Sequence, residues 1–427
     1  MARRWILAAV FFLVVLVIAG TLFFPLYFHR EHISPSISHN PARPPSSSFS
    51  SVPPPSLSPF SNLPTPLVPP LSSPSPSTPP ASLLPSSLAP AFFVLGDSTV
   101  DSGTNNFLGT LARADRFPYG RDFDTHRPTG RFSNGRIIVD YLAIRLGLPF
   151  VPPFLGQVGR VEDMIHGLNY ASAAAGIIFS SGYDLGMHIS LTQQIQQVSD
   201  TFQHFSLILG EEAAADLISR SVFYLSIGSN DFIHYYLSNA SGVQDLYKPS
   251  EFNRLLVGTV QQELKNLYNG NVRKMVVMGL APIGCTPHYL WQYGSDDGEC
   301  VEFINNVVVD FNSAMKNVVN ELNKDLPDAK LAFCDAFKAS MDIFANHDRY
   351  GFVTTTKACC GLGEYGGWIM CLMPRMSCSD ASTHVWWDEF HPTEAVNKIL
   401  ADDVWSSKHA NICSPMNMEE MVRQGMD

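Results

Sequence analysis

From about residue 90 onward, apolar residues follow two alternating patterns. Short, nearly continuous apolar runs that stop at a glycine or a polar turn predict buried strands, and longer stretches with apolar residues on one face predict helices. The sequence predicts strands at 91–95, 168–172, 221–227, 272–278 and 330–334. It predicts helices at 137–146, 191–209, 211–219, 252–268, 301–322 and 393–405. Because strands alternate with helices, we expect a single three-layer α/β/α domain with a mostly parallel five-stranded sheet covered on both faces.

The first 90 residues lack these patterns and divide into two segments. Residues 5–28 carry no charge over 24 positions, and a helix of that length would cover about 36 Å, more than the roughly 30 Å of a bilayer core. Residues 1–33 are therefore interpreted as an uncleaved signal anchor or as a signal peptide cleaved after Ala19. Residues 34–90 hold 18 of the chain's 31 prolines and one charged residue, which predicts an extended, disordered Pro/Ser-rich linker.

Both interpretations of residues 1–33 send the chain into the secretory pathway. The body, residues 91–412, is then extracellular, either secreted or carried outside the cell on a single-pass anchor. Residues 413–427 are assigned to a C-terminal tail. The linker would hold the body away from a membrane or dock it to a cell wall, and an inert spacer is the alternative.

The net charge narrows the range of partners. It is −11 for the chain, and the first 90 residues contribute +3, so the remainder carries −14. Nucleic acids and anionic surfaces bind basic patches, so we exclude nucleic acid as a partner. A neutral acyl ester substrate is compatible with this charge. The body is expected to be monomeric, and any association with a wall or membrane is assigned to residues 1–90.

All eight cysteines lie between residues 285 and 413. An even number of cysteines behind a secretory signal predicts disulfides. Cys285 and Cys300 are expected to close a local loop, whereas the pairing within residues 360–378 is left open. No Cys-x-x-Cys pair occurs and no histidine lies at metal-ligand spacing, so we expect neither a metal nor another cofactor. The one N-glycosylation sequon begins at Asn239 and predicts a glycan there.

Polar residues follow two of the predicted strands, at the sheet edge where open α/β sheets place their sites. Ser98 comes two residues after Gly96, which ends the first apolar run, and Asn230 follows the third. Serine is a weak nucleophile that needs a base and an orienting acid. Asp388 and His391 supply both, in the chain order Ser…Asp…His known from α/β hydrolases, although no Gly-x-Ser-x-Gly elbow occurs.

Three sequence blocks resemble those of the plant-type GDSL (SGNH) hydrolase family. They are Gly96-Asp97-Ser98 with Asp101, Gly103, Asn105 and Asn106, then Gly228-Ser229-Asn230-Asp231, and finally Asp388 with His391-Pro392-Thr393. Residues 130–136, 169–172 and 281–285 also match, so the resemblance covers roughly residues 90–412. It implies the flavodoxin-like SGNH hydrolase fold and a catalytic triad of Ser98, Asp388 and His391. It also implies an oxyanion hole that includes the Ser98 N–H and the Asn230 side chain.

One block departs from the family pattern. Many members carry two glycines after Asn-Tyr-Ala-Ser, where this chain has Ala173 and Ala174. The oxyanion donor implied at this point is a backbone N–H, which alanine also provides, so no donor is lost. By register we expect Ala174 to donate, with Gly176 as the alternative. Asp97 is expected to bind loop amides, and Asp231 to cap the helix that follows it.

The resemblance implies an esterase or lipase that cleaves carboxylic esters of lipids or of cell-wall polymers through an acyl-enzyme. Three alternatives stay open on the sequence. They are an acyltransferase that passes the same acyl group to an alcohol, a carbohydrate esterase specific for acetyl groups, and a non-catalytic, stalked, wall-associated binding module. The intact set of Ser98, Asn230, Asp388 and His391 argues against the binding module.

Overall fold

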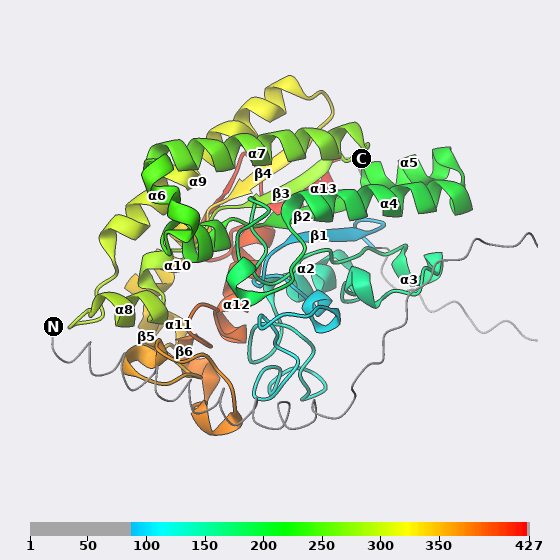
Figure 1. Cartoon of the computed structure of the whole chain (residues 1–427). Helices are drawn as coiled ribbons and strands as arrows, with labels where there is room; N and C mark the ends of the chain where they lie inside the picture. The colour runs from blue at the N-terminus through cyan, green and yellow to red at the C-terminus, as the bar shows by residue number, and fades with distance from the viewer. Residues whose placement is uncertain (1–86, 425–427) are drawn as a thin grey trace, which may run out of the picture. The chain divides into compact units, whose positions relative to one another are not determined.

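The computed structural model describes residues 87–424. The expected signal or anchor, residues 1–33, and the linker as far as residue 86 lie outside the described residues. The described part contains a five-stranded sheet in the order β1-β2-β3-β4-β7 (Figure 1). Strands β1 (Phe92–Gly96), β2 (Val222–Ser226), β3 (Lys274–Met278) and β4 (Lys330–Cys334) are parallel, and β7 (Cys413–Ser414) runs antiparallel to β4. The expected α/β class with a mostly parallel five-stranded sheet is confirmed.

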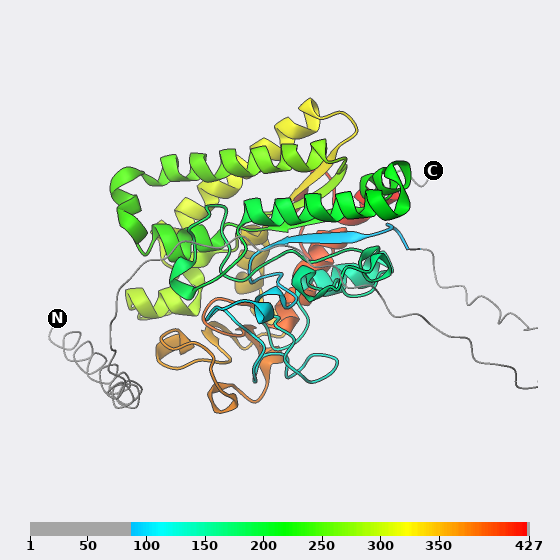
Figure 2. The ribbon, with the colours of Figure 1, turned by 45° about the vertical axis from the view of Figure 1, so that its right-hand side comes forward.

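Helices cover both faces of this sheet (Figure 2). One face carries α4 (Leu191–Leu209), α5 (Glu211–Arg220), α7 (Pro249–Asn269) and α9 (Glu302–Asp325), and the other carries α2 (Ile138–Leu146), α10 (Ala336–Ala345), α12 (Glu394–Ser406) and α13 (Met418–Arg423). Strand side chains enter the two apolar layers alternately: Phe93 and Leu95 of β1 enter the first, Phe92 and Val94 the second. Burial on both faces is why these strands appear in the sequence as continuous apolar runs.

The remaining elements are short. Besides several 3-10 helices of three or four residues, they are α3 (Val161–Met164), α6 (Val243–Leu246), α8 (Pro287–Tyr293), α11 (His347–Tyr350), a π-helix at Asp231–Tyr236, and a parallel pair of strands, β5 (Thr354–Ala358) and β6 (His384–Trp386). The six helices predicted from the sequence correspond to α2, α4, α5, α7, α9 and α12, with ends that agree within three residues. Each of these helices buries one apolar face against the sheet, and the spacing of those apolar residues is the pattern on which the predictions rest.

One predicted strand is wrong. Residues 168–172 form no strand. Three backbone hydrogen bonds join them to Val94 and Gly96 of β1, but the regular pairing is limited to one parallel bridge, between Asn169 and Val94. On the side away from β1, Asn169 pairs with the preceding loop: the Asn169 N–H donates to the Pro152 carbonyl at 2.9 Å. The extended stretch stays short because Gly167 precedes it with φ 119° and Ala174 follows with φ 67°. The fifth strand is β7, and its two residues are too few to form an apolar run.

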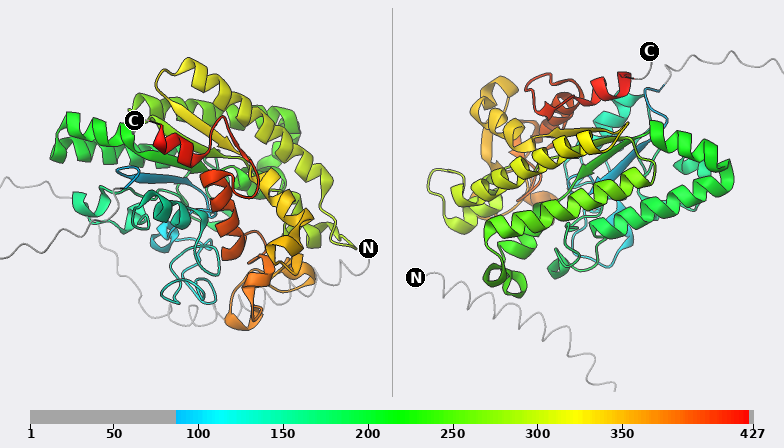
Figure 3. Two further views of the ribbon diagram at one scale, coloured as in Figure 1. Left: turned by 180° about the vertical axis from the view of Figure 1, so that it is seen from behind. Right: turned by 90° about the horizontal axis from the view of Figure 1, so that it is seen from above.

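Four disulfides connect all eight cysteines. The expected pair Cys285–Cys300 is confirmed. Within residues 359–378, Cys359 pairs with Cys378 and Cys360 with Cys371. The fourth disulfide, Cys334–Cys413, joins β4 to β7 across 79 residues of chain. Seen from behind, α13 follows β7 along the edge of the sheet beside β4 (Figure 3), so residues 413–424, assigned to a tail in the sequence, pack on the same core.

Residues 87–424 contain neither a membrane-spanning helix nor a metal-binding cluster. No helix in this part of the chain is long and apolar enough to cross a membrane. Within the same residues, no group of three or more His, Cys, Asp or Glu side chains is arranged to hold a metal ion.

Substitution of Gly167 by alanine should destabilise the fold strongly. A Cβ at this position would lie 1.8 Å from the Phe92 carbonyl oxygen of β1, and φ is 119°, a conformation that L-residues rarely adopt. We expect Gly167→Ala to lower the free energy of unfolding by about 3 kcal/mol or more. Urea unfolding with the disulfides intact measures this change.

The matched control is Gly258→Ala in α7, where a Cβ would meet nothing within 4 Å. Alanine there should be neutral or stabilising by up to about 1 kcal/mol. Equal stability of the two variants would contradict the steric role assigned to Gly167.

Candidate active site

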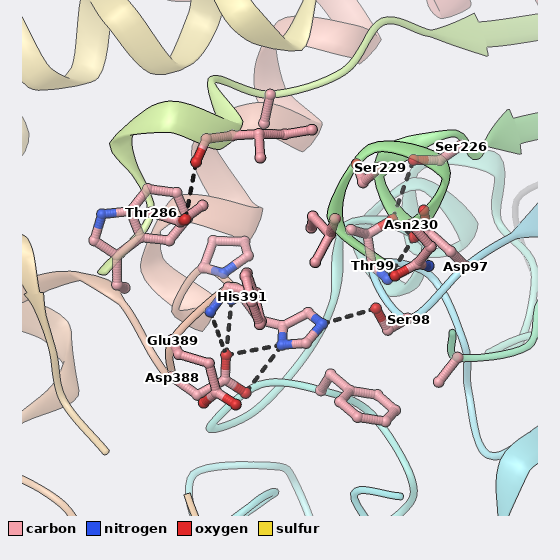
Figure 4. A pocket seen from close by; sticks show the side chains of 18 of the residues that line it. Asp97, Ser98, Thr99, Ser226, Ser229, Asn230, Thr286, Asp388, Glu389 and His391 are labelled. Atoms are coloured by element: carbon pink, nitrogen blue, oxygen red, sulfur yellow. Dashed lines mark hydrogen bonds and ion pairs between the residues drawn. The ribbon is translucent and has the colours of Figure 1, made fainter. Parts of the chain in front are cut away.

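The turn after β1 presents Ser98 at the carboxyl edge of the sheet (Figure 4). Gly96 allows this turn to approach β2, because a Cβ there would lie 2.2 Å from the Ser226 carbonyl oxygen. As expected, the buried Asp97 carboxylate binds the loop: it accepts from the Thr99 N–H at 2.9 Å and from the Thr99 hydroxyl at 2.7 Å. The Thr99 hydroxyl also lies 3.1 Å from the Ser226 hydroxyl, so the turn is attached to β2.

The loop before α12 brings Asp388 and His391 to Ser98. The Ser98 hydroxyl lies 2.7 Å from Nε2 of His391, and Nδ1 of the same ring lies 2.8 and 2.9 Å from the two carboxylate oxygens of Asp388. Asp388 is 1% exposed and also accepts from the backbone N–H groups of Phe390 and His391. The three-residue spacing thus folds into a tight turn around one carboxylate, and Figure 4 shows the resulting chain of hydrogen bonds.

Opposing effects act on the two ionisable partners. Burial alone would raise the pKa of Asp388, but the charge of His391 and the hydrogen bonds donated to the carboxylate lower it. Burial alone would lower the pKa of His391, but the negative charge and hydrogen bond of Asp388 raise it. Ionised Asp388 therefore holds the proton on Nδ1 and leaves Nε2 to accept a hydrogen bond from Ser98.

Tyr119 is a site residue that the sequence did not reveal. Its hydroxyl donates to Oδ2 of Asp388 at 2.8 Å, and its ring packs edge-on against Phe132 and Trp387. Burial, followed by the charge of Asp388, raises the pKa of Tyr119, so the hydroxyl stays protonated and keeps donating. No local pattern marks this residue, which lies in an irregular loop 269 positions before its partner.

Hydrogen-bond donors of three segments lie at the cavity around Ser98. Ser98, Ala174 and Asn230 line one cavity, and the N–H groups of Ser98 and Ala174 make no hydrogen bond to any residue between 87 and 424. The Asn230 side chain donates one N–H to the Ala175 carbonyl at 2.9 Å, and an amide has a second N–H to offer. Gly176 does not line the cavity.

Asp231 has a different role from the expected one. It does not cap the helix that follows; its carboxylate accepts from the N–H groups of Ile177 and Ile178 and from the Ser181 hydroxyl, all within 2.8 Å. Burial raises the pKa of Asp231 to about 6. The chain beyond Ala174 is therefore anchored to the end of β2, next to Asn230. The prediction failed because the partners lie 50 to 54 residues away.

The cavity around Ser98 has a volume of about 210 Å³. The exposed side chains Leu111 and Met370 stand on its outer side, and the buried residues Met278 and Ile343 line its inner end. The predicted glycosylation position, Asn239, lies on an exposed turn with φ 52°, three residues after the π-helix that begins next to Asn230.

Comparisons with known proteins cover most of the described chain. The model of the family described as GDSL-like Lipase/Acylhydrolase matches residues 92–404. A protein named GDSL esterase/lipase 7 from Arabidopsis thaliana is 43% identical over 341 residues, which cover 79% of this chain and 93% of that protein. A second GDSL esterase/lipase of Arabidopsis thaliana is 38% identical over 342 residues, which cover 79% of this chain and 89% of that protein. A third is 40% identical over 336 residues, which cover 78% of this chain and 86% of that protein.

The raised pKa of His391 is measurable. An NMR titration should place the midpoint of the His391 imidazole above its ordinary value of about 6.5, because Asp388 stabilises the charged ring. Asp388→Asn should lower this midpoint by about one pH unit or more, since it removes that charge. His391→Gln, in which the signal disappears, assigns the resonance. A midpoint that does not move in Asp388→Asn would contradict the electrostatic coupling.

Proposed function

Because the chain belongs to the GDSL-like lipase/acylhydrolase family and is a carboxylic ester hydrolase, we propose that it cleaves its acyl ester substrate with a triad of Ser98, His391 and Asp388. The observation that supports this mechanism is the 2.7 Å contact between the Ser98 hydroxyl and Nε2 of a histidine whose other nitrogen is held by a buried carboxylate. The substrates proposed are esters of lipids or of cell-wall polymers.

The reaction proceeds in two halves. Ser98 attacks the ester carbonyl while Nε2 of His391 takes the hydroxyl proton, and ionised Asp388 stabilises the imidazolium. His391 then gives the proton to the departing alcohol, which leaves an acyl-enzyme on Ser98. Water takes the place of the alcohol, His391 activates it, and the acid is released. Because the base must be neutral, activity should rise with pH through the raised pKa of His391.

Three donors are proposed for the negative oxygen of the tetrahedral intermediate. They are the N–H groups of Ser98 and Ala174 and the second side-chain N–H of Asn230. Donors that are already in position stabilise developing charge without reorganisation. Ala174 is preferred to Gly176 because it lines the cavity, whereas a Cβ on Gly176 would point at Ser181 and Asp231.

The chain is proposed to act outside the cell. Four disulfides fit an oxidising, extracellular compartment. We propose residues 1–33 as the signal or anchor, residues 34–90 as a linker that associates with a wall or membrane, and Asn239 as a glycosylated position.

Ser98→Ala should abolish ester hydrolysis. Loss of a triad nucleophile costs on the order of 10⁶ in kcat. The measurement is hydrolysis of p-nitrophenyl esters from acetate to palmitate by the full chain and by the variant. Ser313→Ala, on the exposed face of α9, is the matched control and should retain full activity. Equal rates for the full chain and Ser98→Ala would overturn the serine mechanism.

Asn230→Ala should slow catalysis without abolishing it. Loss of one oxyanion donor lowers kcat by about 10²–10³ with little change in KM, because the bond forms mainly in the transition state. Steady-state kinetics on p-nitrophenyl butyrate, with the melting temperature as a check on folding, measure the effect. An unchanged kcat in a folded variant would remove Asn230 from the oxyanion hole.

A further inference from the structure

The inner end of the Ser98 cavity contains polar groups that the mechanism does not use. We define the inner arm as the part lined by Tyr224, Met278, Ser340, Ile343, Val396 and Asn397. All six are at least nine-tenths buried, and they come from β2, β3, α10 and α12. The arm therefore lies between the sheet and two helices, behind the turn that carries Ser98.

Three of these side chains have hydrogen-bonding groups and no partner between residues 87 and 424. They are the Tyr224 hydroxyl, the Ser340 hydroxyl and the Asn397 amide, in residues that are 1%, 8% and 4% exposed. None of their polar atoms is among the fully enclosed side-chain atoms that lack a partner, so these atoms face the cavity, where water or a ligand pairs with them. Since the three come from three different elements and line the same cavity, they are complementary to a ligand that is apolar along its length and carries a hydrogen-bonding group.

The ester mechanism decides which half of the substrate occupies the arm. After the first half-reaction the alcohol must leave and water must enter, whereas the acyl group stays attached to Ser98. The outer side of the cavity, with exposed Leu111 and Met370, provides that exchange route. The arm, whose lining side chains are buried, provides a place for the acyl group. Its apolar walls, including Met278, Ile343 and Val396, favour a hydrocarbon chain.

The size of the cavity also favours an acyl group longer than acetyl. Its volume of about 210 Å³ exceeds the roughly 150 Å³ of an engineered protein cavity that holds a benzene ring.

Burial and the nearby Asp97 charge raise the pKa of Tyr224, so its hydroxyl remains neutral and donates. Asn397 lies in the first turn of α12, six residues after His391, and offers both a donor and an acceptor.

We propose that the inner arm binds the acyl part of the ester and selects an aliphatic acyl chain that carries a hydroxyl group away from its carbonyl. This inference rests on the proposed function, because the direction of the substrate follows from Ser98 as nucleophile. The substrate hydroxyl pairs with the Asn397 amide and the Tyr224 hydroxyl, which make no hydrogen bond within residues 87–424 and are otherwise left to water.

The test compares two ethyl esters that differ in one group. One is the ester of octanoic acid with a terminal hydroxyl, and the other is the ester of nonanoic acid, in which a methyl group replaces that hydroxyl. We expect the full chain to prefer the hydroxylated ester by about tenfold in kcat/KM, the effect of about one neutral hydrogen bond. Asn397→Leu, which keeps the size of the side chain, should bring the ratio close to one.

Two further variants make the result specific. Tyr224→Phe removes a single oxygen and should also lower the ratio, so the test does not depend on the folding of Asn397→Leu alone. Asn317→Leu, an exposed position of α9, is the matched control and should leave the ratio unchanged. A ratio near one in the full chain would mean that the arm holds water only. A ratio that survives both Asn397→Leu and Tyr224→Phe would place the hydroxyl elsewhere. Either result would overturn the proposal.

Binding to the Ser98→Ala variant tests the assignment of the inner arm separately from the serine mechanism. Calorimetry with the free hydroxylated acid and with nonanoic acid measures the arm without catalysis, and tighter binding of the hydroxylated acid is expected. If this preference is present but neither ester is hydrolysed by the full chain, the serine mechanism fails, whereas the preference of the arm for a hydroxylated chain stands. If esters are cleaved with no preference in rate or binding, the assignment of the arm alone fails.

Discussion

Buried carboxylates hold together the loops on which the site depends. Ser98, Ala174 and His391 all lie on irregular segments at the carboxyl edge of the sheet, where backbone N–H groups lack the partners that a strand or helix would provide. Asp101 accepts from the N–H groups of Gly103, Thr104 and Ala173, and Asp231 accepts from the chain just beyond Ala174. Asp388 does the same for the His391 turn. Charge-assisted hydrogen bonds thereby fix segments that are distant in sequence.

The predictable parts of the fold are those with a local cause. Strands β1 to β4 are buried on both faces, and the long helices have one apolar stripe, so each carries a visible pattern. Residues 168–172 have the same apolar character but are shared between β1 and the preceding loop, and no local pattern distinguishes that arrangement from a strand. Strand β7 forms because Cys413 pairs with Cys334, 79 residues away, and continues the sheet. A strand of two residues has no pattern in the sequence that predicts this contact.

In the site, too, the residues marked by a local pattern were predictable, and those that depend on distant contacts were not. Ser98, Asp388 and His391 were found because a short spacing or the end of a strand marks them, and the structure brings them within hydrogen-bonding distance of one another. Tyr119 and the partners of Asp231 were missed because their roles depend on contacts between distant loops. The choice between Ala174 and Gly176 was open in the sequence because it depends on which residue lines the cavity.

The Cys334–Cys413 disulfide has a consequence beyond the sheet. The segment between these cysteines contains Asp388, His391 and the other two disulfides of the 359–378 region, so it is a covalently closed ring. A protease that cuts this ring once leaves both pieces attached to the same molecule. Asp388 and His391 thus remain tethered to Ser98 after a nick, which would suit the extracellular location proposed for this protein.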